Sequence, residues 1–129
     1  MPAEPVSADT TPPARGHYSA ATLSEGSKIL EVAGQLPEGP DGQLIGGDDA
    51  EAQARQCLKN IDDLVRAVGA QKSDIARIGV FLTSMADRAA VARAREEYFG
   101  DHKPSATLFQ VAALVSPEFK VEIEATVVF

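Results

Sequence analysis

The stretch PSATLFQVAALVSPEFKVEIEATVVF, residues 104–129, decides the fold. It contains two apolar-rich runs, residues 106–115 and 119–129, with the pair Ser116-Pro117 between them. Short runs of this composition are typical of β-strands, and a Ser-Pro pair favours a turn. The stretch therefore predicts two strands joined by a tight connection.

The second run alternates between apolar and polar side chains. The apolar set is Val121, Ile123, Ala125 and Val127, and the polar set is Glu122, Glu124 and Thr126. Successive side chains of a strand point to opposite faces of its sheet, so the apolar set is expected in the core. The opposite face carries two carboxylates in an otherwise apolar setting. If a partner chain covers that face, these acids become candidate functional groups.

A β-hairpin is predicted upstream, with strands at residues 17–23 and 28–36 on either side of a turn signal. Gly34 lies inside the second strand, where a glycine indicates either a β-bulge or the close approach of another backbone or a ligand. A simple bend before Pro37 is the alternative interpretation. Residues 37–47 are rich in glycine and proline and predict a loop.

Residues 54–68 carry apolar side chains at helical spacing and predict an amphipathic helix. Asp48 or Asp49 is suited to cap its start, and Gly69 is suited to end it. Cys57 lies on the apolar face of this helix. A free thiol in such a place is typical of a small buried hydrophobic group rather than a nucleophile.

Residues 75–83 predict a further strand, and residues 87–99 a second amphipathic helix that ends at Gly100. The order is then β, β, α, β, α, β, β. This order favours an α+β fold, a two-layer sandwich with both helices on one side of a single sheet. Residues 1–15 contain four prolines and are expected to be a flexible or extended segment before one domain, residues 16–129.

Composition limits the classes of function. A chain of 129 residues is expected to form one domain, and its net charge of -7 speaks against binding to nucleic acid or to anionic membranes. Neither a membrane-length apolar run nor a secretion-signal pattern is visible, and the single cysteine fits a reducing compartment, so a cytoplasmic location is expected. Without a metal-ligand cluster, phosphate loop or cofactor motif, no metal or cofactor is expected.

The sheet face away from the helices is expected to be too apolar to remain in water. It is predicted to carry Tyr18, Phe81 and Leu108 beside Glu122 and Glu124. Large exposed apolar patches mark interaction sites, so we expect a homo-oligomer joined sheet to sheet.

Six short motifs follow one another along the chain. They are Gly16-His17-Tyr18, Val32-Ala33-Gly34-Gln35-Leu36-Pro37, Gln53-Ala54-Arg55-Gln56 with Asn60, Ile78-Gly79-Val80-Phe81-Leu82, Tyr98-Phe99 and Val121-Glu122-Ile123-Glu124-Ala125. Together they resemble the RidA/YjgF family, the enamine/imine deaminases also named L-PSP endoribonucleases. The resemblance implies a chorismate-mutase-like fold and a homotrimer whose sheets form a central barrel, with small-molecule clefts between the subunits.

The sequence departs from the family at the cleft. The family carries an arginine on the strand after Pro104 that binds the substrate carboxylate, and Ala106 stands in its place. Leu108 replaces the usual cysteine, Ala33 a serine and Ala92 an asparagine. A methyl group cannot replace a bidentate guanidinium, so the cleft is expected to be apolar and to prefer neutral or hydrophobic substrates.

The resemblance implies that Glu122 positions or activates water and that Tyr18 orients the substrate beside the backbone at Gly34. His17 is a candidate proton carrier, whereas Glu124 is expected to be mainly structural. The alternative for Glu122 is that it only accepts hydrogen bonds between subunits. The expected substrate-binding residues are Gly34, Ala33, Phe81, Ala92, Ala106, Thr107 and Leu108.

Two functions follow from these residues. The first is hydrolysis and deamination of a small imine or enamine, or a related enol/imine tautomerisation, with Glu122 as acid and base. The alternative is a trimeric module without catalysis that binds a small molecule or a protein. Ribonuclease activity fits poorly, because the sequence offers no basic groove for a phosphate backbone.

Overall fold

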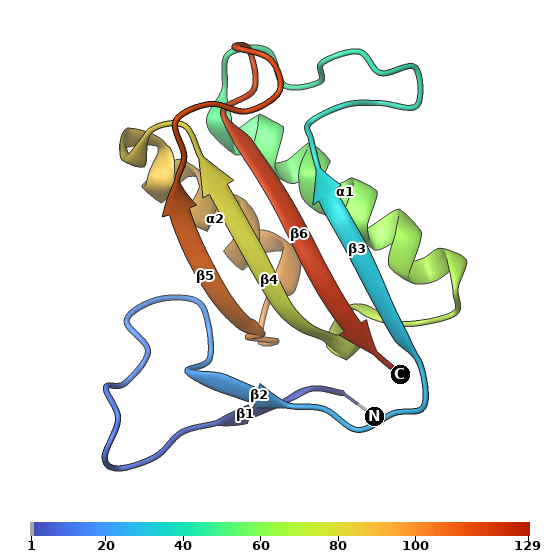
Figure 1. Ribbon diagram of the computed structural model, residues 1–129, viewed down its shortest axis with the longest axis vertical. Helices are drawn as coiled ribbons and strands as arrows, with labels where there is room; N and C mark the ends of the chain where they lie inside the picture. The colour runs from blue at the N-terminus through green and yellow to red at the C-terminus, as the bar shows by residue number, and fades with distance from the viewer. Residues whose placement is uncertain (1) are drawn as a thin grey trace.

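A computed structural model describes residues 2–129 as a four-stranded sheet, a two-stranded ribbon and two helices (Figure 1). The strands are β1 (Glu4–Val6), β2 (Ala21–Leu23), β3 (Ile29–Gln35), β4 (Ile75–Leu82), β5 (Ser105–Gln110) and β6 (Val121–Val128). The helices are α1 (Ala50–Ala67) and α2 (Arg88–Phe99), each close to a short 3-10 turn, Lys72–Asp74 and Met85–Asp87. Both helices lie on one face of the sheet, as expected from the order of the elements.

The main sheet has the order β3-β6-β4-β5, with β6 in its interior. β6 pairs antiparallel with β3 and β4, whereas β4 and β5 are parallel and are connected through α2. The prediction of two strands with a tight connection is therefore wrong in one respect: β4 lies between β5 and β6. Residues 111–120 cross the end of β4, so the expected strand at residues 106–115 ends at Gln110.

The alternation in β6 is confirmed. Val121, Ile123, Ala125 and Val127 are at most 3% exposed, and their neighbours Glu122, Glu124 and Thr126 point to the other face. The apolar set packs with β4 and α1 in one core. Burial of a Val or Ile side chain stabilises the fold by about 1.5–3 kcal/mol, so this one strand face accounts for several kcal/mol of gross stabilisation.

The predicted hairpin at residues 17–36 is wrong. β2 pairs with β1, and β3 pairs with β6 instead of β2. The segment between β2 and β3 does not turn back on itself because it passes the end of β6: a Cβ on Gly26 would stand 2.8 Å from the Phe129 nitrogen, and the Lys28 N–H donates to the Phe129 carbonyl at 2.9 Å.

The start of the chain is extended. Residues of β1 pair with β2, and the N–H of the buried Ala3 donates to the Ser73 carbonyl at 2.9 Å. Residues 1–15 were expected to be either flexible or extended, and residues 4–6 are extended, as strand β1. A separate unit ending at residue 15 stays a prediction.

Helix α1 begins and ends as the sequence predicts. The Asp49 side chain accepts from the N–H groups of Glu51 and Ala52, at 2.9 and 3.3 Å, and Gly69 has a φ of +80° after the last turn. These contacts satisfy backbone groups that a helix end otherwise leaves without partners. The helix is thereby fixed across the sheet, and it leaves the far face uncovered.

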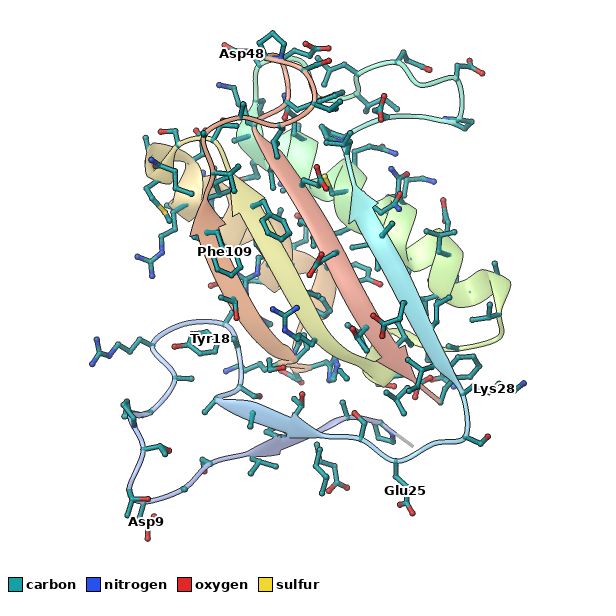
Figure 2. The ribbon with its side chains drawn as sticks, in the orientation of Figure 1. Asp9, Tyr18, Glu25, Lys28, Asp48 and Phe109 are labelled. Atoms are coloured by element: carbon teal, nitrogen blue, oxygen red, sulfur yellow. The ribbon has the colours of Figure 1, made fainter. Side chains whose placement is uncertain are left out.

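The uncovered side of the main sheet, here called the open face, carries aromatic and acidic side chains. Phe81 and Phe109 stack on it with ring centroids 5.5 Å apart, and Phe109 is 43% exposed (Figure 2). The expectation that Leu108 lies on this face is wrong, because Leu108 is in register with the buried Val80 and packs against the core. Among residues 2–129, no helix has the length and apolarity to cross a membrane.

Candidate functional site

A cavity of about 310 Å³ lies between helix α2, strand β5 and the loop before β2. Its lining residues are Gly16, His17, Tyr18, Arg88, Ala92, Arg95, Ala106, Thr107 and Leu108. The structure thus brings together six of the residues that the sequence singled out, from three segments far apart in the chain.

Backbone geometry explains this convergence. Ala106 and Leu108 are in register with the buried Ile78 and Val80, so both point toward the helix layer at the edge of the sheet. Residues four and three apart on a helix share one face, which places Arg88, Ala92 and Arg95 on the same side of α2. The cavity fills the space between these two walls.

The loop that closes the cavity is held by contacts at its end. The Ser19 N–H donates to the Pro104 carbonyl at 3.2 Å, and the Ser19 hydroxyl donates to the Lys103 carbonyl. Within the loop, the Tyr18 N–H donates to the Gly16 carbonyl at 2.9 Å, and the Tyr18 hydroxyl accepts from the Arg15 N–H at 3.2 Å. Figure 2 shows the Tyr18 ring on this loop, beside β5.

His17 has one ring nitrogen in use and one free. Its Nε2 lies 2.7 Å from the Gly100 carbonyl, and because a carbonyl only accepts, Nε2 carries the hydrogen. Nδ1 is buried and has no partner among residues 2–129. In the neutral ring this nitrogen has an acceptor lone pair, so the side chain can take a proton or a hydrogen bond from a ligand.

Two guanidinium groups line the cavity, and the sequence analysis did not place them there. Arg95 is only 8% exposed, and its Nη2 donates to the His17 carbonyl at 3.2 Å. Burial lowers the pKa of Arg95, and the charge of Arg88 lowers it further, against the opposing effect of Glu96. The expectation of an apolar cleft without a cation is therefore wrong for this cavity.

Glu122 and Gly34 form a second arrangement, on the open face. The register between β3 and β6 shifts between Val32 and Gln35, which confirms the β-bulge interpretation of Gly34. A Cβ on Gly34 would stand 1.9 Å from Oε2 of Glu122, so the carboxylate occupies the place of a side chain at residue 34. Among residues 2–129, no donor binds that carboxylate through a hydrogen bond.

Other predicted residues share this face. Glu124 lies over Gly79, and its Oε2 is 3.4 Å from Nη1 of Arg77. Phe81 is in register with Glu122, and Ala33 is exposed in the bulge. Since β4 separates β6 from β5, the Glu122 backbone lies two strand spacings, roughly 10 Å, from Phe109, and Ala106 is three residues further along β5. One chain therefore holds the cavity and the acid in two separate places.

Fold and cavity together define a small α+β protein with a cavity at the edge of its main sheet. The chain belongs to the Endoribonuclease L-PSP family, also called the RidA/YjgF or Rid family, whose model matches residues 8–129. The resemblance and the YjgF-like fold class are thus confirmed.

Individual relatives cover nearly the whole chain. It is 37% identical over 124 residues to the RutC family protein y4sK of Sinorhizobium fredii, covering 96% of both chains. It is 34% identical over 124 residues to the 2-iminobutanoate/2-iminopropanoate deaminase of Rattus norvegicus, covering 95% of this chain and 88% of that protein. A crystal structure of YyfB, a conserved Rid family protein of unknown function from Yersinia pestis, superposes with a TM-score of 0.90 at 31% identity over the full length of both chains.

Proposed function

We propose that this protein is a Rid-type hydrolase that acts on a small reactive imine or enamine, or performs a related enol/imine tautomerisation. The observation that carries the proposal is the Glu122 carboxylate, which lies over the Gly34 bulge without a hydrogen-bond donor among residues 2–129. Relatives named imine deaminases share about a third of the sequence. The cytoplasm remains the proposed location.

We further propose that the working site lies between subunits of a homotrimer. Glu122 and the cavity are too far apart to meet within one chain, so a neighbouring copy has to bring its open face to the cavity edge. The stacked Phe81 and Phe109 rings give the open face an apolar surface for that contact. A closed ring of three such contacts produces three equivalent clefts.

In the proposed hydrolysis, Glu122 takes a proton from water while the oxygen forms a bond to the imine carbon. The carbon–nitrogen π electrons move to nitrogen, which accepts a proton, and a carbinolamine results. Proton transfer through Glu122 then expels ammonia as the carbonyl forms, so one imine and one water give one carbonyl compound and one ammonia. Tyr18 orients the substrate. In tautomerisation the same carboxylate moves a proton between carbon and nitrogen or oxygen.

Ammonia release from freshly generated imines tests the proposal. Glu122→Gln should abolish the catalysed release while the oligomer stays intact, because the amide cannot exchange a proton as the carboxylate does. Glu31→Gln is a matched control, since Glu31 accepts from Thr126 Oγ1 at 3.4 Å beside the open face and is exposed. Equal ammonia release by the wild type and Glu122→Gln would contradict the proposed role.

The alternative function is a trimeric module that binds a small molecule or a protein without catalysis. Ala106 favours it, because β5 lacks the guanidinium of the catalytic family members while a cavity of about 310 Å³ is still present. Such a module would be stabilised against heat by its ligand, and Glu122→Gln would leave that stabilisation unchanged.

A further inference from the structure

Arg95 has unused hydrogen-bond donors in a buried place. A guanidinium has five N–H donors, yet within residues 2–129 the side chain of Arg95 makes one hydrogen bond, from Nη2 to the His17 carbonyl at 3.2 Å. Its Nε is buried and has no partner among residues 2–129. Burying a cation without an anion is costly, so a buried arginine with one carbonyl partner is suited to bind a further, negatively charged group.

The other arginines of this helix pair and of β4 are neutralised. Arg55, Arg66, Arg77 and Arg93 each pair with a carboxylate, whereas Arg88 and Arg95 form no ion pair within residues 2–129. The chain has 19 acidic residues against 12 basic ones, so carboxylates are abundant. Both unpaired cations of α2, Arg88 and Arg95, therefore line the cavity, and a bound anion would neutralise them there.

The remaining walls describe the shape of the ligand. Opposite α2, Ala106 contributes only a methyl group and leaves room beside the guanidinium. His17 Nδ1 offers an unused acceptor at the same cavity. Thr107 offers no hydroxyl there, because it is in register with Gly79 and its side chain points to the open face. A small 2-imino acid has the matching groups, because its carboxylate accepts from arginine while its N–H can donate to an imidazole nitrogen. The volume of about 310 Å³ suits a compact molecule.

We propose that Arg95, assisted by the exposed Arg88, binds the carboxylate of a small 2-imino or 2-oxo acid in this cavity. The anchor that the family places on the strand at Ala106 is thus supplied from helix α2. This inference deepens the proposed function by assigning the carboxylate of the substrate to a residue of helix α2, and only its reaction rests on that function. It reverses the expectation of neutral substrates.

Equilibrium binding tests the anchor without any turnover. The probes are 2-oxobutanoate, the product of 2-iminobutanoate hydrolysis, and its neutral methyl ester, titrated calorimetrically into the full-length protein. The acid should bind more tightly than the ester. Because a hydrogen bond to a charged group contributes about 1.5–3 kcal/mol, Arg95→Met should weaken acid binding about ten- to a hundredfold and leave ester binding unchanged.

Arg93→Met is the matched control, because Arg93 lies two residues earlier on the same helix, is exposed and pairs with Glu51 at 2.5 Å. It should bind the acid as the wild type does. Arg88→Gln should weaken acid binding by a smaller factor than Arg95→Met, and it keeps the test decisive if the buried substitution prevents folding. Thermal unfolding without ligand identifies such a failure.

Equal affinity for acid and ester, no acid binding up to the solubility of the probe, or unchanged acid binding in both variants would overturn the inference. Its failure is separate from that of the reaction. Acid binding that needs Arg95 in a protein that releases no ammonia would keep the anchor and reject the hydrolase. Ammonia release from neutral imines at the same rate in the wild type and in Arg95→Met would keep the hydrolase and reject the anchor.

Discussion

The Glu122 carboxylate lies where the side chain of residue 34 would be, since a Cβ on Gly34 would stand 1.9 Å from Oε2 and 2.7 Å from Cδ. The bulge in β3 and the missing side chain together leave space for the acid above the sheet. The glycine thus sets the position of the acid, and changing residue 34 offers a way to move the carboxylate without altering it.

Gly34→Ala should reduce ammonia release nearly as much as Glu122→Gln while changing the free energy of unfolding by about 1 kcal/mol or less. The added methyl displaces the end of a flexible side chain and leaves the backbone in place. Gly79→Ala is the matched control, because its Cβ would stand 2.8 Å from Oε2 of Glu124 and so moves the structural acid instead. Ammonia release and urea unfolding measure both variants. Full activity in Gly34→Ala would show that the position of Glu122 does not matter.

Cys57 should resist alkylation in the folded protein. It is fully buried, and burial, with a smaller effect from the charge of Glu122, raises the pKa of its thiol to about 12. At pH 8 the reactive thiolate is then only about one part in ten thousand. Iodoacetamide labelling followed by mass spectrometry should show modification only after unfolding in guanidinium. Fast labelling of the native protein would show that the helix opens.

Tyr98 should make the protein less stable at alkaline pH. Burial and the 2.6 Å bond from its hydroxyl to Asp62 Oδ1 raise the pKa of Tyr98 above its ordinary value near 10. Above that pH the unfolded chain loses the proton first, so the free energy of unfolding falls as pH rises. Tyr98→Phe should cost about 1.5–3 kcal/mol at neutral pH and flatten the alkaline decline. Urea unfolding across pH 8–11 measures this, and parallel declines in both proteins would contradict it.

The open face should form the contact between subunits. Phe109→Glu places a charge in the apolar surface and should convert a trimer into monomers, because an unpaired charge is costly to bury. Leu64→Glu is the control, since Leu64 is 42% exposed on α1, close to the 43% of Phe109. Light scattering after size-exclusion chromatography gives the mass, expected to be three times 13.6 kDa for the wild type and for Leu64→Glu. A monomeric wild type would contradict the proposed composite site.

Local signals in the sequence predicted much of the fold. The alternation of β6, the Asp49 cap and Gly69 were sufficient because each depends on neighbours within a few residues. The hairpin prediction failed because strand pairing is decided by distant partners. The segment at Gly26 passes the C-terminal Phe129, which lies far away in sequence, and β3 finds its partner in β6.

The same limit applies to the site. The resemblance predicted Tyr18 and Ala106 at the site, but it did not predict Arg95. An arginine on a helix with many charged residues is usually exposed to solvent. Only the loop that follows Gly16 and the edge of β5 turn the face of α2 that carries Arg95 into a cavity wall, and both contacts are distant in sequence. The spacing of Arg88, Ala92 and Arg95 is the signal that, combined with the predicted role of Ala92, indicates the cavity.

The bond from Arg95 to the His17 carbonyl connects the proposed anchor to the loop that closes the same cavity. An anion that competes for this guanidinium, or that holds it more firmly, alters how readily the loop detaches from the helix. Thermodynamic linkage makes the effect reciprocal: if the bound ligand stabilises the closed loop, the closed loop increases the affinity for the ligand by the same free energy. Slower amide exchange at residues 16–19 would then report filling of the cavity even for a compound that is never turned over.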